Sequence, residues 1–310
     1  MRLVYLGSPE VAVGPLRRLV AAGHEVLLVV SQPDKKRGRG GALSPSPVKR
    51  AAIELGLPVS DRLADVVAAV DLGAQLGVVV AYGRLIRPDL LDIVPFVNLH
   101  FSLLPRWRGA APVERAILAG DSETGVCLMR LERTLDTGPV YRRTATSIGP
   151  AESASSLRSR LSVIGAQMLE EAISGGLVGL GEPVDQVGEP TYAAKLDPAQ
   201  FAVRWAEPAE AIARLVRIEL AWTTFRGRRL KLIEAAAVLD RGVDTMAATS
   251  QIGELSRHGP EVWVRTGAGF LRLVAVQPDG RSAMNAVQWW HGVRPQRAER
   301  LENQSERTIE

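Results

Sequence analysis

Short apolar runs alternate with helical stretches along the first half of the chain. Four of these runs are rich in valine and bounded by turn residues: Leu3–Leu6, Val26–Val30, Val78–Ala81 and Phe96–Leu99. Runs of this length and composition are typical of parallel strands buried on both faces. The alternation predicts an α/β fold, Rossmann-like, in which helices cover both faces of a mostly parallel sheet.

The first connection between strand and helix, GSPEV at residues 7–11, is short. We expect Ser8 to cap the helix, Pro9 to be its first residue and Gly23 to mark its end. A helix that starts directly after a strand is a ready anion site. The turn nevertheless has only one of the three glycines of the dinucleotide-binding fingerprint, which disfavours NAD.

A long basic segment, SQPDKKRGRGGALSPSP at residues 31–47, follows the second strand. Its glycines and prolines predict an irregular loop. Six cations and no acid lie between Lys35 and Arg50. The segment is either a solvated insertion or a basic flap that closes over a polyanion, and we favour the flap because one sign of charge is so concentrated. The cations of the loop itself are Lys35, Lys36, Arg37 and Arg39.

The richest chemistry lies in FVNLHFSLLPRWRGAAP at residues 96–112. Asn98 and His100 are two residues apart, so both point to one side at the carboxyl end of a predicted strand, where open parallel sheets bind ligands. An imidazole can move protons near neutrality, and an amide can donate to an oxyanion. A single histidine after a strand is more often structural, but the loop that follows it favours function. Trp107 is equally well a stacking platform or a loop anchor.

A carboxylate follows in the turn LDTGP at residues 135–139. Asp136 would orient the imidazole and stabilise its protonated form, as carboxylate partners of catalytic histidines do. DTGP alone is a common turn, and spacing does not choose Asp136 over Asp121 or Glu132.

The rest of the chain divides again near residue 200. Helical spacing runs from Ala151 to Gly175, and GEPVDQVGEP then has the composition of a linker. An amphipathic helix at Glu207–Ile218 precedes short strands separated by glycine turns, which predict a small closed β-barrel. The expected strands are Arg229–Ala235, Ile252–Leu255, Val262–Thr266 and Phe270–Val276. The candidate phosphate contacts here, or else a solvated strand face, are Arg226, Arg228, Arg229 and Lys231.

Composition adds little that is specific. The 310 residues are 46% hydrophobic and 23% charged, with a formal net charge of +4. No apolar run approaches a membrane span, so we expect a cytoplasmic protein. The single cysteine, Cys127, excludes an intramolecular disulfide and a cysteine-based metal site, and its apolar neighbours predict a buried thiol.

Several separated segments, in order along the chain, carry a family resemblance. They are LGSPE, QPDKKRGRG, VVVAYG, NLHFSLLPRWRGAAP, LDTGP and TYAAKL. Together with the basic C-terminal part, they resemble the folate-dependent formyltransferases and, among these, the methionyl-tRNA formyltransferase family. Asn, His, Asp and SLLP are common to the wider superfamily, whereas the basic loop and the C-terminal domain select this member.

The resemblance implies transfer of a formyl group from 10-formyltetrahydrofolate, as cosubstrate, to the α-amino group of methionine on initiator tRNA. Asn98, His100 and Asp136 match the catalytic trio, without a metal. The turn that contacts folate matches Ser102, Leu103, Leu104 and Pro105, and the loop arginine that reaches the tRNA acceptor end matches Arg39. We also expect Arg106 and Arg108, with the cations of the basic loop, to contact the tRNA.

The implied architecture is a catalytic domain at 1–180, a linker at 181–203 and an OB-like tRNA-binding domain at 204–310, in a monomer. Two alternatives stay open. Another folate-dependent formyltransferase or hydrolase acting on a small amine would share the trio without needing the basic loop. A non-catalytic RNA-binding protein would keep the basic zones and leave folate unbound.

Overall fold

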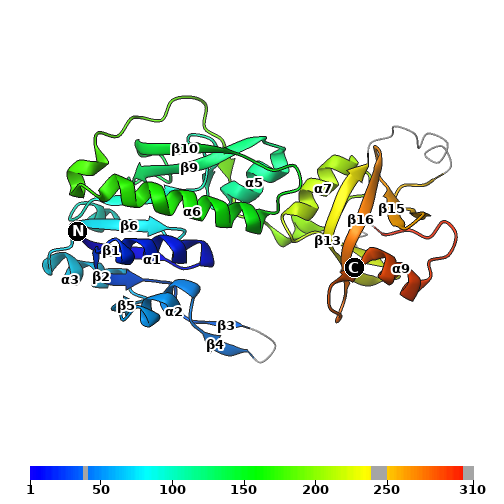
Figure 1. Ribbon diagram of the computed structural model, residues 1–310, viewed down its shortest axis with the longest axis horizontal. Helices are drawn as coiled ribbons and strands as arrows, with labels where there is room; N and C mark the ends of the chain where they lie inside the picture. Colours follow the sequence, from blue (N-terminus) through cyan, green and yellow to red (C-terminus); the bar gives the residue numbers. More distant parts are fainter. Residues whose placement is uncertain (38–40, 239–249, 303–310) are drawn as a thin grey trace, which may run out of the picture. The chain divides into compact units, whose positions relative to one another are not determined.

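The computed structural model describes residues 1–37, 41–238 and 250–302 (Figure 1). They form two compact units. The first unit comprises Met1–Arg115, Ser122–Ile148 and Ser156–Lys195, and the second comprises Ala116–Asp121, Gly149–Ser155 and Leu196–Glu310. The domain boundaries expected from the sequence stay a prediction. Among the described residues, no helix is long and apolar enough to cross a membrane.

The first unit is built on a seven-stranded sheet in the order β10-β9-β7-β6-β1-β2-β5. Its strands are β1 (Arg2–Gly7), β2 (Glu25–Val30), β5 (Val59–Ser60), β6 (Leu76–Val80), β7 (Phe96–His100), β9 (Glu123–Arg130) and β10 (Val140–Ser147). The five strands from β7 to β5 run parallel, whereas β9 pairs antiparallel with both β7 and β10. This confirms the α/β prediction and the four predicted strands.

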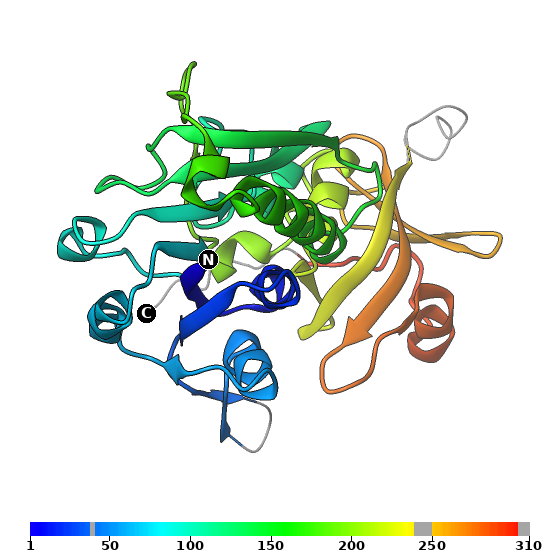
Figure 2. The ribbon, with the colours of Figure 1, turned by 60° about the vertical axis from the view of Figure 1, so that its left-hand side comes forward.

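Helices cover both faces of this sheet. On one face, α1 (Val13–Ala21) and α6 (Ala154–Ile173) lie side by side (Figures 1 and 2), and Ser162 of α6 donates to the carbonyl of Val11. On the other face, α3 (Val66–Asp71) and α4 (Pro88–Leu91) share a core with β1 and β2. The other helices of the unit are η1 (Glu10–Ala12), α2 (Pro47–Glu54), η2 (Leu63–Asp65) and η3 (Gly176–Leu180), whereas α5 (Pro112–Ala119) is divided between the two units at Arg115.

Two local predictions for this unit were wrong. Ser8 does not cap a helix: its hydroxyl accepts from the backbone N–H of Gln32, and Pro9 is the N-cap of η1 instead. The segment 31–47 is also not wholly irregular, since β3 (Lys35–Arg37) pairs antiparallel with β4 (Ala42–Ser44). β4 lies between the glycines and the prolines of this segment, and these turn residues hide the short strand in the sequence.

The second unit is an antiparallel sheet in the order β12-β13-β16-β15-β14, with β17 beside β16. Its strands are β12 (Trp222–Phe225), β13 (Arg228–Val238), β14 (Leu255–His258), β15 (Glu261–Arg265), β16 (Phe270–Pro278) and β17 (Met284–Asn285). It also contains η4 (Pro198–Phe201), α7 (Ala209–Arg217) and α9 (Ala286–Val293). The expected strand at Ile252–Leu255 was wrong in extent, because pairing with β15 starts only at Leu255.

Residues 300–302 join both edges of this sheet. Glu302 bridges to Thr224 of the β12 edge, and Arg300 bridges to Glu254 beside the β14 edge. Leu301 between them is only 2% exposed, within the apolar core of the unit. Residues 300–302 therefore complete the curved sheet into the OB-like form that the sequence predicts.

Candidate active site

The predicted catalytic residues lie at the carboxyl end of β7. Asn98 is half-buried on this strand and pairs with Val79 and Met129 of the neighbouring strands. The Asn98 side chain makes no hydrogen bond to any residue in the described ranges 1–37, 41–238 and 250–302, so its amide is available to a ligand. Two residues on, His100 is 5% exposed and ends the strand.

His100 is held from two sides. Its Nε2 lies 2.8 Å from the carbonyl oxygen of Trp107, which can only accept, so Nε2 is the donor. Its Nδ1 lies 3.6 Å from Oδ2 of Asp136. The structure thus brings His100 and Asp136 together, and it leaves Asp121 and Glu132 out of this contact.

Asp136 occupies a constrained turn. Its φ of 52° is in the left-handed region, and its Oδ2 accepts from the backbone N–H of Gly109 at 2.8 Å. Two residues later, a Cβ on Gly138 would meet the carbonyl oxygen of Arg130 at 2.0 Å. The turn approaches the strand so closely that only glycine fits there, which explains the spacing in LDTGP.

The SLLP turn follows β7 directly. Ser102 is fully buried and donates to the carbonyl of Arg106 at 2.5 Å, and the Leu104–Pro105 peptide is cis. Leu104 is 1% exposed and packs with Cys127 and Met129. Because the side chains of Ser102 and Leu104 point into the protein, these residues can meet folate only through their backbone.

A third segment, residues 184–193, completes the site, and we call it the strap. Val184 bridges to Val140, and β11 (Tyr192–Ala193) of the strap pairs parallel with β8 (Arg108–Gly109). The hydroxyl of Thr191 accepts from the backbone N–H of Trp107 at 2.9 Å. Sequence reasoning missed this role, because the strap is a polar, glycine- and proline-containing stretch without periodicity.

The predicted tRNA-contacting cations are placed unevenly. Lys35 and Lys36 are exposed on β3, whereas Arg39 lies outside the described residues, as does the side chain of Arg37. Because β2 and β7 run parallel, the segments that follow them leave the sheet at the same edge.

The two cations of the loop after β7 both have contacts already. Arg106 lies over the Trp107 ring, 4.6 Å from its centroid. Arg108 donates twice to Oε1 of Gln186. A tRNA contact by Arg108 would therefore compete with Gln186.

The cysteine has no part in this chemistry. Cys127 is fully buried, and burial raises the pKa of its thiol, which keeps the thiol neutral near pH 7. In the part of the chain that the structure describes, no group of three or more His, Cys, Asp or Glu side chains could hold a metal ion.

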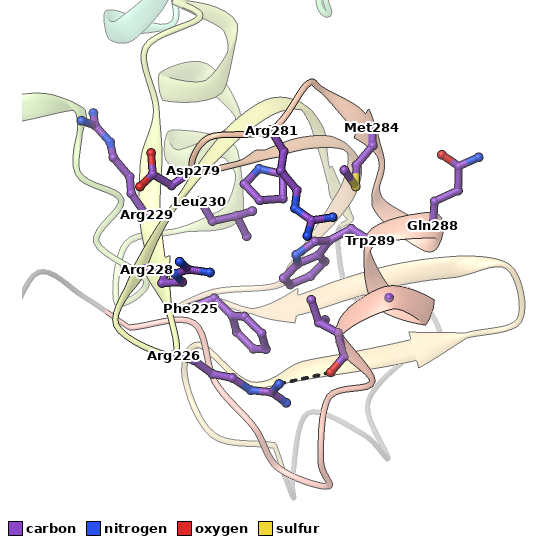
Figure 3. Close-up of a pocket in the computed structure, with 13 residues that line it drawn as sticks. Phe225, Arg226, Arg228, Arg229, Leu230, Asp279, Arg281, Met284, Gln288 and Trp289 are labelled. Carbon is purple, nitrogen blue, oxygen red and sulfur yellow. Dashed lines mark hydrogen bonds between the residues drawn. The ribbon is translucent and has the colours of Figure 1, made fainter.

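A second basic feature is a cavity of about 400 Å³ in the second unit, between β12, β13 and α9 (Figure 3). Arg226 is paired with Glu299 at 2.6 Å, and Arg229 lies over the ring of Trp222. By contrast, the guanidinium groups of Arg228 and Arg281 have no hydrogen-bond or ion-pair partner among the described residues, and both face the cavity. They are free to bind an anion.

Family comparison agrees with the fold. Residues 1–173 match the model described as "Formyl transferase", and residues 195–294 match "Formyl transferase, C-terminal domain". Together with the histidine at the end of β7 and the carboxylate in the turn between β9 and β10, these matches define the class of protein as a formyltransferase.

Similar curated proteins narrow the class. A methionyl-tRNA formyltransferase of Clavibacter michiganensis is 42% identical over 303 residues, covering 94% of this chain and 97% of that protein. One from Jannaschia sp. is 42% identical over 307 residues, covering 95% of this chain and 97% of its own. The chain belongs to the methionyl-tRNA formyltransferase family.

Solved structures share the fold at low identity. HypX from Aquifex aeolicus superposes with a TM-score of 0.65 at 16% identity, covering 94% of this chain and 47% of that one. An N-formyltransferase from Helicobacter canadensis gives 0.65 at 15% identity, covering 89% of this chain and 98% of that one. Its crystals contain folinic acid and dTDP-3-aminofucose.

Proposed function

We propose that the chain transfers the formyl group of 10-formyltetrahydrofolate to the α-amino group of methionine esterified to initiator tRNA. The observation that carries the proposal is the arrangement of the free Asn98 amide and the His100–Asp136 pair at the end of β7, in a chain with near full-length methionyl-tRNA formyltransferase relatives.

In this proposal Asn98 stabilises the oxyanion. The neutral amine attacks the formyl carbon, a C–N bond forms, and the carbonyl oxygen becomes negatively charged in a tetrahedral intermediate. The Asn98 amide has N–H donors that no described residue uses. An oxyanion donor of this kind contributes about 3 kcal/mol to the transition state.

His100 moves the protons in the same reaction. The attacking nitrogen must lose a proton, and N10 of the folate must gain one when its bond to the formyl carbon breaks and tetrahydrofolate leaves. His100 Nε2 donates to the Trp107 carbonyl in the free protein, so this bond must open before Nε2 exchanges protons with substrate. Asp136 beside Nδ1 holds the ring during this exchange.

The folate cosubstrate belongs at the same sheet edge. The winding of the sheet reverses between β1 and β6, and β7 is the next strand. Crevices at such switch points bind ligands in open α/β sheets. The backbone of Ser102–Pro105, which leaves β7 at this edge, is our proposed folate contact.

The tRNA is the polyanion that the basic features serve. Lys35 and Lys36 are exposed on the hairpin after β2, and Arg228 and Arg281 face the cavity of the second unit. Unpaired guanidinium groups suit phosphate, which they bind through charge-assisted hydrogen bonds.

The proposal is tested by incubating the full chain with 10-formyltetrahydrofolate and methionyl initiator tRNA, followed by deacylation and detection of N-formylmethionine. Free methionine and a nucleotide-linked amino sugar serve as alternative acceptors. We expect formylmethionine only from the charged tRNA. Formylation of a small amine, with none of the tRNA, would contradict the proposal.

A further inference from the structure

One side chain of the strap ties together the two loops of the active site. Gln186 donates from Nε2 to the carbonyl oxygens of Asp136, at 2.9 Å, and Gly138, at 2.8 Å. Its Oε1 accepts from Nε and Nη2 of Arg108, at 3.0 and 2.7 Å. Gln186 thus makes four hydrogen bonds, all to the two segments that surround His100.

The turn that Gln186 holds is the one that carries the carboxylate. Asp136 has a left-handed backbone, which costs a non-glycine residue free energy and persists only where its surroundings fix it. The two carbonyls that receive the Gln186 amide flank Thr137, directly after the residue whose Oδ2 faces His100. Losing both bonds would free the backbone that aims the carboxylate.

The Oε1 end of Gln186 holds the loop whose Trp107 carbonyl accepts a hydrogen bond from His100. Arg108 belongs to β8, and the carbonyl of Trp107 next to it accepts from His100 Nε2. Gly109 on the other side donates its N–H to Asp136. A single amide therefore connects both partners of the histidine ring, one on each side of it.

We propose that Gln186 is a positioning residue for the transfer reaction, acting through Asp136 on the orientation of His100. This rests on the proposed function and adds a residue outside the two segments that match the family models, 1–173 and 195–294. Within the strap, it is the Gln186 side chain that reaches the loops around His100.

Two substitutions of Gln186, tested in the full chain, distinguish its bonds to the 136–138 turn from its bonds to Arg108. Gln186→Ala removes all four bonds, whereas Gln186→Glu keeps the acceptor for Arg108 and loses both donors to the 136–138 turn. We expect kcat for formyl transfer to fall about 10- to 100-fold in both variants, because small misplacements of catalytic groups have effects of this size. KM for 10-formyltetrahydrofolate stays within about twofold, since the proposed folate contacts at Ser102–Pro105 are unchanged.

The matched control is Val187→Ala, the next residue of the strap, whose side chain is 83% exposed. It should keep wild-type kcat. If neither the wild type nor the Val187→Ala control transfers the formyl group, the result contradicts the proposed function rather than the role of Gln186. Full kcat in Gln186→Glu, with Gln186→Ala impaired or not, would overturn that role.

A double-mutant cycle distinguishes positioning from general destabilisation. In an Asp136→Ala variant the carboxylate that Gln186 positions is absent. Adding Gln186→Ala to this variant should therefore change kcat less than twofold. An equal further loss in that background would show that Gln186 acts independently of Asp136 and would overturn the proposal. Thermal unfolding of each variant verifies that it is folded. If Gln186→Ala is not folded, Gln186→Glu replaces it in the cycle.

Discussion

The loops around His100 and the cavity of the second unit use their polar groups in opposite ways. Around His100, each functional side chain except Asn98 is bonded within the protein, through Trp107, Asp136, Gly109 and Gln186. In the cavity, Arg228 and Arg281 have no such bonds among the described residues.

This difference predicts that the first region determines the rate of formyl transfer and the second the affinity for tRNA. Groups fixed by the fold lose little freedom when the transition state forms, so they contribute to kcat. Exposed cations without protein partners exchange counterions for phosphates, so they contribute binding that depends on salt. Changes in the first region should therefore alter the rate of transfer, and changes in the second should alter tRNA affinity.

The largest expected effect is that of His100→Ala. Loss of the proton carrier should lower kcat about 1,000-fold, within the range for general acid–base residues. The dissociation constant for tRNA, measured by filter binding, should stay unchanged. A variant with near-normal transfer would show that His100 has no such role.

A smaller loss is expected from Gly138→Ala, because the new methyl group would overlap the carbonyl of Arg130. Displacement of the turn should lower kcat about 10- to 100-fold and the free energy of unfolding by about 1–3 kcal/mol. Steady-state kinetics and urea unfolding measure the two effects. Gly175→Ala, at an ordinary φ of −89°, is the control and should show neither.

Replacement of Arg228 and Arg281 together by alanine should weaken tRNA binding about tenfold and lower the salt slope of log K by about 1 to 2. At saturating tRNA, kcat should be unchanged. Arg62→Ala removes an exposed arginine that is already paired with Asp65, and it should leave binding as in wild type. A pair variant that binds normally would exclude the cavity from the tRNA surface.

The smallest expected effect concerns pH. The hydrogen bond from Arg226 holds the pKa of the Glu299 carboxyl below its ordinary value. Since the folded pKa is depressed, the pair stabilises the second unit above the unfolded pKa of Glu299, and this contribution is lost as pH falls through the folded value. The difference in Tm between wild type and Arg226→Met should be constant from pH 6 to 8 and shrink below about pH 4.5. A difference that grows on acidification would contradict this.

Local patterns predict the sheet well. The valine-rich runs of β1, β2, β6 and β7 are buried on both faces, so hydrophobicity alone marks them. His100 and Asn98 were found because a period of two and the end of a strand place them on one side.

The features that the sequence does not reveal depend on contacts between distant residues. Gln186 bonds with Asp136 and Arg108, which are 50 and 78 residues away, and its own neighbourhood has the composition of a loop. Ser8 fails as a helix cap because its hydroxyl accepts from the backbone N–H of Gln32, in the segment after β2. The bridge between Glu302, near the end of the chain, and Thr224 of β12 is likewise not predictable, because Glu302 lies in a short polar segment.

Single-turnover formyl transfer by the Asn98→Ala chain tests the central claim most directly. Asn98 is bonded to no described side chain, so its loss leaves the loops around His100 intact. We predict a fall in the transfer rate on the order of 100-fold at saturating folate and tRNA, with the tRNA dissociation constant unchanged at every salt concentration. A wild-type rate, or a loss explained entirely by weaker tRNA binding, would contradict the account.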